Sequence, residues 1–188
     1  MGFVDSLTVM LLSAGFSALL FAFYVYLLIR GKKDFSMLIV PSFIFGTFDA
    51  VSGFVMSFTW PLPGAYNMLF GDPLLIVGLL LISIACMTYK KMDARILSIF
   101  AVFLGIYIAV GTVGMITFHL ESGLDLISAL GFYIAAALSS LFAPIVYLNT
   151  KGSGRYAYWF LFILLILTAF AAFFIGFNGF YSHLQSPP

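Results

Sequence analysis

The sequence predicts an all-α fold, an integral membrane bundle of six helices that forms one transmembrane domain over residues 1–188. Three observations predict it. The chain is 63% hydrophobic and 8% charged, whereas soluble domains carry about 25% charged residues. A chain this short cannot bury so much apolar surface in water, so the bilayer has to be its solvent. Six long apolar runs follow one another, and short connectors hold the Lys and Arg residues.

Each apolar run is long enough to cross a hydrocarbon core of about 30 Å, which takes about 20 helical residues. The first run lacks a basic start and a small-residue cleavage site, so we expect a membrane helix there rather than a cleaved signal peptide. The approximate spans, in order, are 6–29, 35–58, 73–90, 95–118, 123–148 and 156–180.

Carboxylates stand at the expected start of five of these helices. Asp5, Asp34 and Asp93 precede the first, second and fourth spans. Asp72 is followed directly by a proline, the pattern of an N-cap before a proline in the first turn. Asp125 stands three residues after a serine and resembles the acidic partner of a capping box. These five carboxylates therefore have a structural explanation.

The basic residues fix the expected orientation. They gather in loops 30–33, 90–95 and 151–155, and the connectors between these loops contain no Lys or Arg. The positive-inside rule places these three loops in the cytoplasm. The chain is then a multi-pass protein of the cell membrane with three hairpins and both termini outside. An inverted three-plus-three arrangement of the spans is the alternative.

Stripes of small residues predict where the helices pack on one another. Small side chains let membrane helices approach closely, which compensates for the missing hydrophobic drive between them. Pro144 is expected to bend the fifth span near its end. The stripes are Gly46, Ala50, Gly53 and Ser57; Ala101, Gly105, Ala109 and Thr112; Ser128, Gly131, Ala135, Ser139 and Ala143; and Thr168, Ala172, Gly176 and Gly179.

Asp49 is the carboxylate that no helix start explains. It lies about 14 residues into the second span, near the middle of the bilayer. An acidic side chain there costs roughly 2.5–3.5 kcal/mol on insertion scales, so it should face the bundle interior beside a polar partner or water. Ser52 lies near its face and could donate a hydrogen bond. The alternative is an aspartate that only fixes helix packing.

The connector after the second span is the longest. It is apolar and aromatic, and its two prolines prevent a regular helix at its start. We expect Trp60, Tyr66 and Asn67 to shape the outer mouth of a path that leads to Asp49. The alternative is a belt of aromatic side chains at the membrane interface.

His119 and Glu121 follow the fourth span on the outer side and are candidate metal ligands. Their spacing matches no known metal motif. The sequence contains no phosphate-binding loop, nucleophile elbow or paired-cysteine motif, and no basic face suited to nucleic acid. We therefore expect no enzyme, no bound cofactor and no nucleic-acid partner.

The long connector also carries a resemblance. Its residues are Trp60-Pro61-Leu62-Pro63-Gly64-Ala65-Tyr66-Asn67, then Phe70-Gly71-Asp72-Pro73. This segment resembles the signature of a family of uncharacterised archaeal and bacterial polytopic membrane proteins, and the resemblance implies no activity. The size, six spans and outside termini are similar to the urea and short-chain amide channel family, and this likeness implies a homo-oligomer in which each bundle has its own pore. The outer loops lack the histidine-rich segment of those channels.

Two functions follow as hypotheses. The first is a channel or transporter for a small neutral or weakly polar solute, or for protons, with Asp49 on the path. The second is an accessory subunit of a larger respiratory-type membrane complex, with an outer-face metal site at His119 and Glu121. The expected partners are the lipid bilayer, the solute or proton, and further copies of the chain or other membrane subunits.

Overall fold

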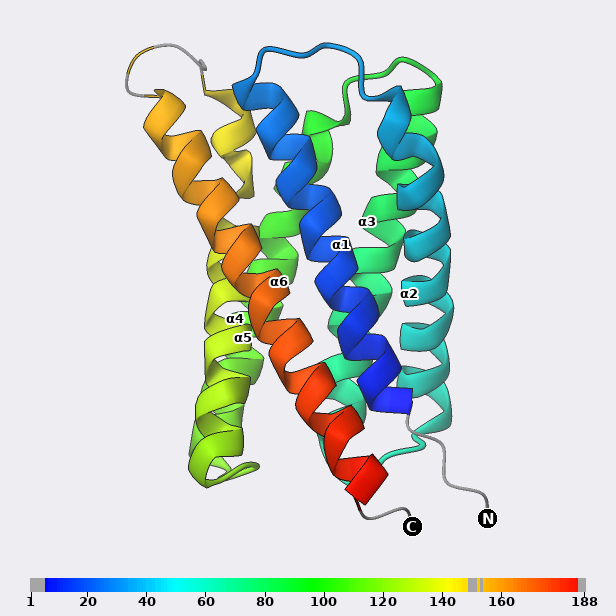
Figure 1. The fold of residues 1–188 in the computed structure, drawn as a ribbon, viewed down its shortest axis with the longest axis vertical. Coiled ribbons are helices and arrows are strands. Elements are labelled where there is room, and N and C mark those ends of the chain that lie inside the picture. Colours follow the sequence, from blue (N-terminus) through cyan, green and yellow to red (C-terminus); the bar gives the residue numbers. More distant parts are fainter. Residues whose placement is uncertain (1–5, 149–151, 153, 186–188) are drawn as a thin grey trace.

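The computed structural model describes residues 6–148, 152 and 154–185 and confirms the six-helix fold (Figure 1). All six helices are long and apolar enough to cross a membrane, and the described residues contain no strand. The chain is therefore a polytopic membrane protein. The helices are α1 (Ser6–Ile29), α2 (Ile39–Thr59), α3 (Asp72–Tyr89), α4 (Leu97–Thr117), α5 (Gly123–Leu141) and α6 (Gly154–Gln185).

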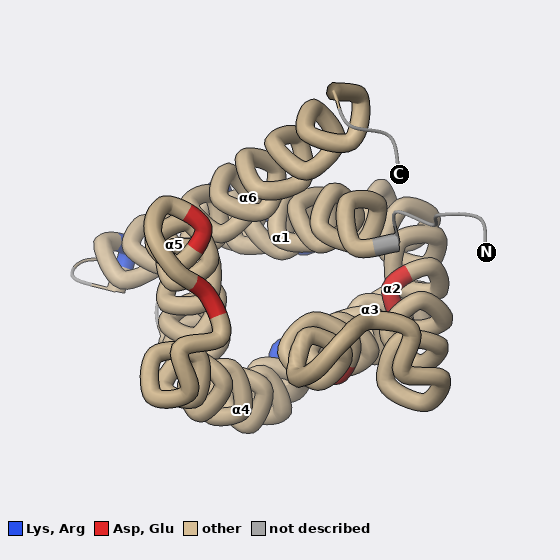
Figure 2. Tube along the Cα trace, turned by 90° about the horizontal axis from the view of Figure 1, so that it is seen from below, with Lys and Arg blue, Asp and Glu red and all other residues tan. Residues whose placement is uncertain are grey.

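The helices form a ring in chain order, which Figure 2 shows end-on. The most extensive packing joins α2 to α3, α1 to α6 and α4 to α5, and α5 also packs on α6. By comparison, α1 touches α2 and α3 touches α4 over thin seams. Each basic loop joins the two helices of one predicted hairpin. The most extensive packing, however, joins helices of different hairpins, so the tightest pairs are shifted by one helix around the ring. The first and last helices close it.

Glycines account for the closeness of α2 and α3. A Cβ atom on Gly53 would overlap the backbone at Leu75, and one on Gly78 would overlap the backbone at Ala50. The two helices can therefore approach this closely only because these positions carry no side chain. The small-residue stripe predicted on the second span is confirmed as a packing seam.

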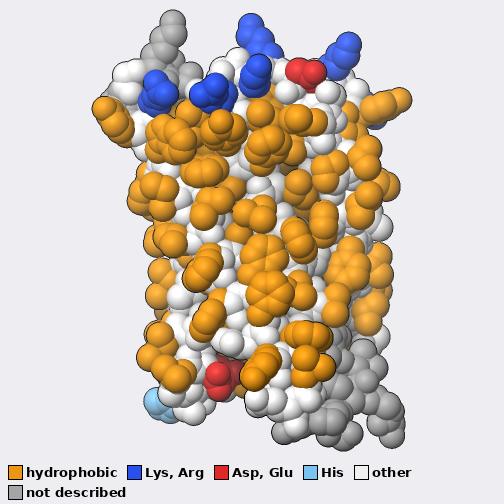
Figure 3. All heavy atoms as spheres, viewed as in Figure 1, with side chains coloured by type: hydrophobic (Ala, Val, Ile, Leu, Met, Phe, Trp, Pro, Cys, Tyr) orange, Lys and Arg blue, Asp and Glu red, His pale blue; other side chains and the backbone are white. Residues whose placement is uncertain are grey.

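The three basic loops lie at one end of the ring, called here the basic face. Figure 3 shows Lys and Arg side chains at this end and hydrophobic side chains along the wall below it. This distribution fits a wall in contact with lipid. Lys151 and Asp5 lie outside the described residues, and the cytoplasmic placement of the basic face stays a prediction.

Asp93 forms its predicted cap, whereas Asp34 lies one residue before Phe35, the N-cap of the short 3-10 helix Ser36–Leu38. Asp34 accepts a hydrogen bond of 2.9 Å from the backbone N–H of Ser36, and this bond lowers the pKa of Asp34. Asp93 accepts one of 3.0 Å from the backbone N–H of Arg95. The side chain of Arg95 is the main reason why the pKa of Asp93 is lowered.

Two other predicted caps are wrong. The Ser122 side chain makes no capping hydrogen bond, because Gly123 enters α5 with a φ of +58° and turns the chain there. Asp72 has helical dihedral angles and does not cap α3. The helical segment begins six residues before the predicted start, with a π-helical turn over Asn67–Gly71.

A short 3-10 helix, Ala143–Tyr147, follows the end of α5. Pro144 stands in its first turn, where a missing N–H is tolerated. The change of helix type lies at the position where the sequence predicts a bend.

Candidate functional site

The ring surrounds a partly open cavity of about 170 Å³. Five of the six helices line it, together with the short helical turns that adjoin them, whereas none of the described residues of α2 does so. The cavity is comparable in size with an engineered apolar cavity of about 150 Å³ that stays dry and binds benzene.

Alanines make room for this cavity at its middle level. Ala18 comes from α1, Ala101 from α4 and Ala136 from α5. Their side chains are too short to reach the centre of the ring, so a space remains that leucines would fill. The surrounding lining is formed by Leu, Val, Ile and Phe side chains, including Leu74, Val77 and Leu104. Such a surface suits an apolar molecule.

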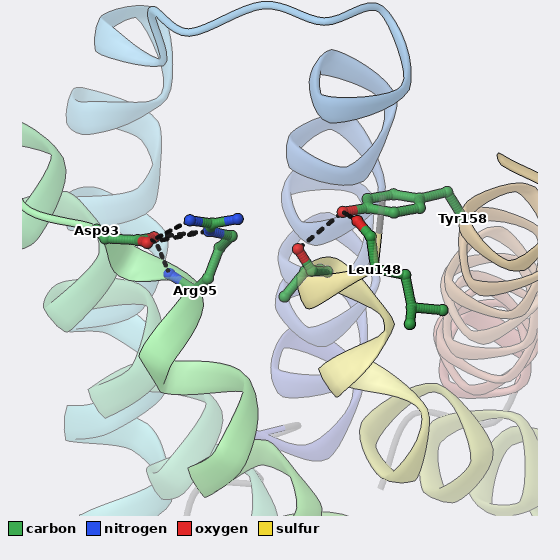
Figure 4. Close-up of polar contacts among 5 residues, drawn as sticks. Asp93, Arg95, Leu148 and Tyr158 are labelled. Carbon is green, nitrogen blue, oxygen red and sulfur yellow. Dashed lines mark hydrogen bonds and ion pairs between the residues drawn. The ribbon is translucent and has the colours of Figure 1, made fainter. Parts of the chain in front are cut away.

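The end of the cavity near the basic face is polar. Ser98 lies here in the first turn of α4, with Arg95 from the 3-10 helix Ala94–Ile96 that precedes α4 and Tyr24 from α1. Asp93 accepts hydrogen bonds from the Arg95 side chain at Nε (3.0 Å) and Nη2 (2.6 Å). The Arg95 guanidinium also lies 5.5 Å from the centre of the Tyr147 ring. In Figure 4 the guanidinium extends from the Asp93 contact toward the segment that carries Leu148.

Tyr158 fixes the neighbouring wall at this end. Its hydroxyl donates hydrogen bonds to the carbonyl oxygens of Val146, at 2.7 Å, and Leu148, at 3.1 Å (Figure 4). These bonds satisfy carbonyls where the 3-10 helix ends. They hold the polar end of the cavity in a defined shape, because buried backbone groups are costly to leave unpaired.

The other end of the cavity is closed by the π-helical turn and the start of α3. Pro73 lacks an N–H, so the carbonyl oxygen of Leu69, four residues earlier, cannot receive the usual helical hydrogen bond. The hydroxyl of Tyr133 on α5 donates to that oxygen instead, at 2.6 Å. The bond joins α5 to the turn across the end of the cavity.

Asp49 lies outside this cavity, between α1 and α2. Its side chain is 0% exposed. The hydroxyls of Ser13 and Ser17, one turn apart on α1, each donate a hydrogen bond of 2.5 Å to one of its carboxyl oxygens. Ser52, the predicted donor, is only half-buried, and the two bonds that Asp49 accepts come from α1. The contacts favour a structural bond across the thin α1–α2 seam, and a role on a solute path stays a prediction.

The residues predicted for the outer mouth have separate positions. Trp60 is half-exposed and ends α2 with a φ of +52°. Asn67 is 0% exposed and holds the connector, because its side chain accepts a hydrogen bond from the N–H of Leu62 and donates one to the carbonyl of Leu62. Tyr66 reaches the loop between α4 and α5. The three residues predicted for the mouth are therefore spread over the end of α2, the connector and the contact with the following loop.

Glu121 accepts a hydrogen bond of 2.8 Å from the Tyr66 hydroxyl, which also donates to the Leu120 carbonyl at 3.0 Å. Burial is the main cause that raises the pKa of Tyr66, and the bond to Glu121 adds to it. His119 is exposed, with a φ of +50°. Within residues 6–148, 152 and 154–185, no group of three or more His, Cys, Asp or Glu could hold a metal ion. The metal site at His119 and Glu121 therefore stays a prediction, and no third His, Cys, Asp or Glu ligand accompanies them among those residues.

Asp72 joins three helices. Its carboxyl oxygens accept hydrogen bonds of 2.5 Å from the hydroxyls of Ser57 on α2 and Tyr107 on α4. The bond to Tyr107 spans the thin seam between α3 and α4. Each thin seam of the ring is therefore bridged by an aspartate that lies within a spanning segment.

Sequence reasoning missed the polar end of the cavity. Arg95 was interpreted only as a basic loop residue, and Ser98 was not considered. A usable signal was present, because the two residues stand one helical turn apart at the basic end of an apolar span. Their shared position on the helix could have indicated a polar patch on the bundle interior.

Comparison with known proteins gives a family and no function. A protein-family model described as "Protein of unknown function (DUF981)" matches residues 1–186. No curated protein and no solved structure matches the chain. The likeness to urea and amide channels stays a prediction.

Proposed function

This chain belongs to the DUF981 family of proteins of unknown function, and we propose that it is a membrane transporter whose central cavity carries a mainly apolar, single-chain solute. The mainly apolar, partly open cavity carries the proposal. A site lined mostly by Leu, Val, Ile, Phe and Ala binds apolar surface, and its few polar groups orient the ligand.

The shape of the cavity favours one extended chain. Its lining runs from Arg95, in the 3-10 turn Ala94–Ile96, along α4 to Ile108, a length of about 20 Å at 1.5 Å per residue. A volume of about 170 Å³ over such a length is a narrow space. A bulky or branched solute would need the helices to separate.

The proposal narrows the solute class expected from the sequence. A small polar solute or a proton would need polar groups along its path, and Asp49 was the candidate. The lining is mainly apolar, and the hydroxyls of Ser139 and Thr168 within it donate to carbonyls of their own helices. Asp49 is held by Ser13 and Ser17 outside the cavity. A transporter of apolar chains agrees better with these positions than a path for protons does. The accessory-subunit role and the homo-oligomer stay predictions.

The test is movement of a labelled single-chain amphiphile across reconstituted vesicles. The probe is radiolabelled hexadecyl phosphate without a bulky reporter group. Albumin extracts it from the outer leaflet only, so later extraction reports transfer from the inner leaflet. Val77 lines the cavity on α3, whereas Val51 on α2 is 58% exposed on the outer wall. Val77→Trp fills the cavity, and Val51→Trp is its matched control.

Wild-type protein and Val51→Trp should both accelerate transfer above that of protein-free vesicles. Val77→Trp should return the rate to the protein-free level while the protein keeps its helical content by circular dichroism. A Val77→Trp protein that is folded and as fast as wild type would overturn the proposal.

A further inference from the structure

We propose that Arg95 and Ser98 form a head-group site for the anionic end of a single-chain amphiphile, a carboxylate or a phosphate, part of whose tail lies in the cavity. This inference rests on the proposed function and adds the chemical class of the solute. It also adds the direction in which the solute lies, with its head at the basic face.

Ser98 is the first indication of a ligand. Its side chain lines the cavity and is 9% exposed. Its Oγ is buried and has no hydrogen-bond partner among the described residues. Buried hydroxyls nearly always have a partner, because an unpaired one has lost its water without compensation. A ligand oxygen at this end of the cavity would accept the missing hydrogen bond.

Arg95 supplies the charge. It stands three residues before Ser98, so the two side chains lie one helical turn apart and both line the cavity. Asp93 accepts hydrogen bonds from Nε and Nη2, and the Nη1 donors are not used in that pair. A guanidinium has five N–H donors. The remaining donors can bind an oxyanion, for which arginine is well suited.

The surroundings favour an anion over a neutral head. Arg95 belongs to the basic face, where the other Lys and Arg side chains gather (Figure 3). Asp93 is the opposing charge in direct contact, 2.6 Å from Arg95 Nη2. Because Asp93 competes for the same guanidinium, its removal should strengthen binding of an anionic head. A guanidinium with a merely structural role would show no such increase.

The experiment measures binding of three radiolabelled probes to the purified protein in detergent by scintillation proximity. Palmitate and hexadecyl phosphate have the same tail with different anionic heads, and hexadecanol has a neutral head. The variants are Arg95→Gln, Asp93→Asn and Ser98→Ala. Arg155→Gln is the matched control, since Arg155 is an exposed arginine of α6 that does not line the cavity. Val77→Trp reports on the cavity itself.

We expect Arg95→Gln to weaken binding of at least one anionic probe about tenfold, which corresponds to about 1.4 kcal/mol, and to leave hexadecanol unchanged. Asp93→Asn should strengthen binding of that anionic probe. Ser98→Ala should weaken all three probes a few-fold, and Arg155→Gln should change none. The stronger anionic probe identifies the head as carboxylate or phosphate.

The outcomes separate the two proposals. If Val77→Trp leaves binding of all three probes intact, the cavity is not the site and the proposed function fails. If Val77→Trp abolishes binding but Arg95→Gln affects the anionic probes and hexadecanol equally, the cavity binds chains and the head-group site is wrong.

Discussion

The hydroxyl of Tyr133 donates a hydrogen bond of 2.6 Å to the carbonyl oxygen of Leu69, which Pro73 leaves without its helical donor. The bond lies in the interior, since Tyr133 is 2% exposed. The Tyr133 hydroxyl on α5 thus provides the hydrogen-bond donor that Pro73 lacks at the start of α3.

Tyr133→Phe should therefore lower the free energy of unfolding by about 1–3 kcal/mol, because a buried carbonyl loses its partner. Pro73→Ala restores an N–H within reach of the same oxygen, so Tyr133→Phe should cost less in that background. A double-mutant cycle on thermal unfolding in detergent measures the difference. Equal costs in both backgrounds would show that the two groups do not share this carbonyl.

The seam between α1 and α2 depends on Asp49. Ser13→Ala or Ser17→Ala leaves one carboxyl oxygen buried without a donor, and each should cost about 1–3 kcal/mol of stability. Asp49→Asn should cost less, because an amide can still hydrogen-bond both hydroxyls. Ser83→Ala is the control, since Ser83 Oγ bonds only the Leu79 carbonyl of its own helix. Thermal unfolding of all variants in one detergent, without chemical denaturant, gives the comparison of stability. A loss no larger than that of Ser83→Ala would contradict the role of the serines.

The contact of α2 with α3 should not tolerate a methyl group. Gly53→Ala places a Cβ against the α3 backbone, so the helices must separate. Overpacking of this kind typically costs about 1–3 kcal/mol. Gly131→Ala is the matched control, because nothing lies within 4 Å of a Cβ at that helical position. It should be neutral or stabilising by up to about 1 kcal/mol. Similar melting temperatures for the two variants would disprove the close contact.

The α2–α3 connector and the α4–α5 loop should separate at alkaline pH. The pKa of Tyr66 is raised by burial and by its bond to Glu121, so the neutral phenol is favoured in the folded protein. The stabilisation from this contact is complete below the ordinary tyrosine pKa of about 10. It is lost as the pH rises through the higher folded value.

Glu121→Gln should shift the pKa of Tyr66 downward, because a hydrogen bond to a carboxylate and its negative charge are removed. Nuclear magnetic resonance of ring-labelled tyrosine, with Tyr66→Phe to assign the signal, follows the titration. An unchanged Tyr66 pKa in Glu121→Gln would leave burial as its sole cause.

The helices and their small-residue contacts could be predicted from sequence because both depend on local patterns. A long apolar run specifies a span, and Gly53 on a small-residue stripe specifies a close neighbour. The identity of that neighbour depends on surfaces far apart in the chain. The start of α3 was predicted to within one residue, but the π-helical turn before it was missed. Asp72 followed by Pro73 is typical of a helix start, whereas the turn continues the helical segment on the N-terminal side of the proline.

The candidate site was predictable only in part. Asp49 stood out as a charge within a span, but its partners Ser13 and Ser17 lie on another helix, so a search along its own helix found only Ser52. The cavity could not be predicted, because the alanines that line it read like those that pack helices together. Only the arrangement of the alanines around the ring distinguishes those that line the cavity from those that pack helices together.

The closure of the ring between α1 and α6 has a consequence for biosynthesis. The chief neighbour of α1 is α6, which leaves the ribosome after the other five helices of the ring. Until α6 inserts, the first helix can be kept beside the growing bundle by Asp49 and its two serine donors. The interior meanwhile stays open to the surrounding lipid, so a chain-like molecule can be enclosed during membrane insertion, before the finished wall exists.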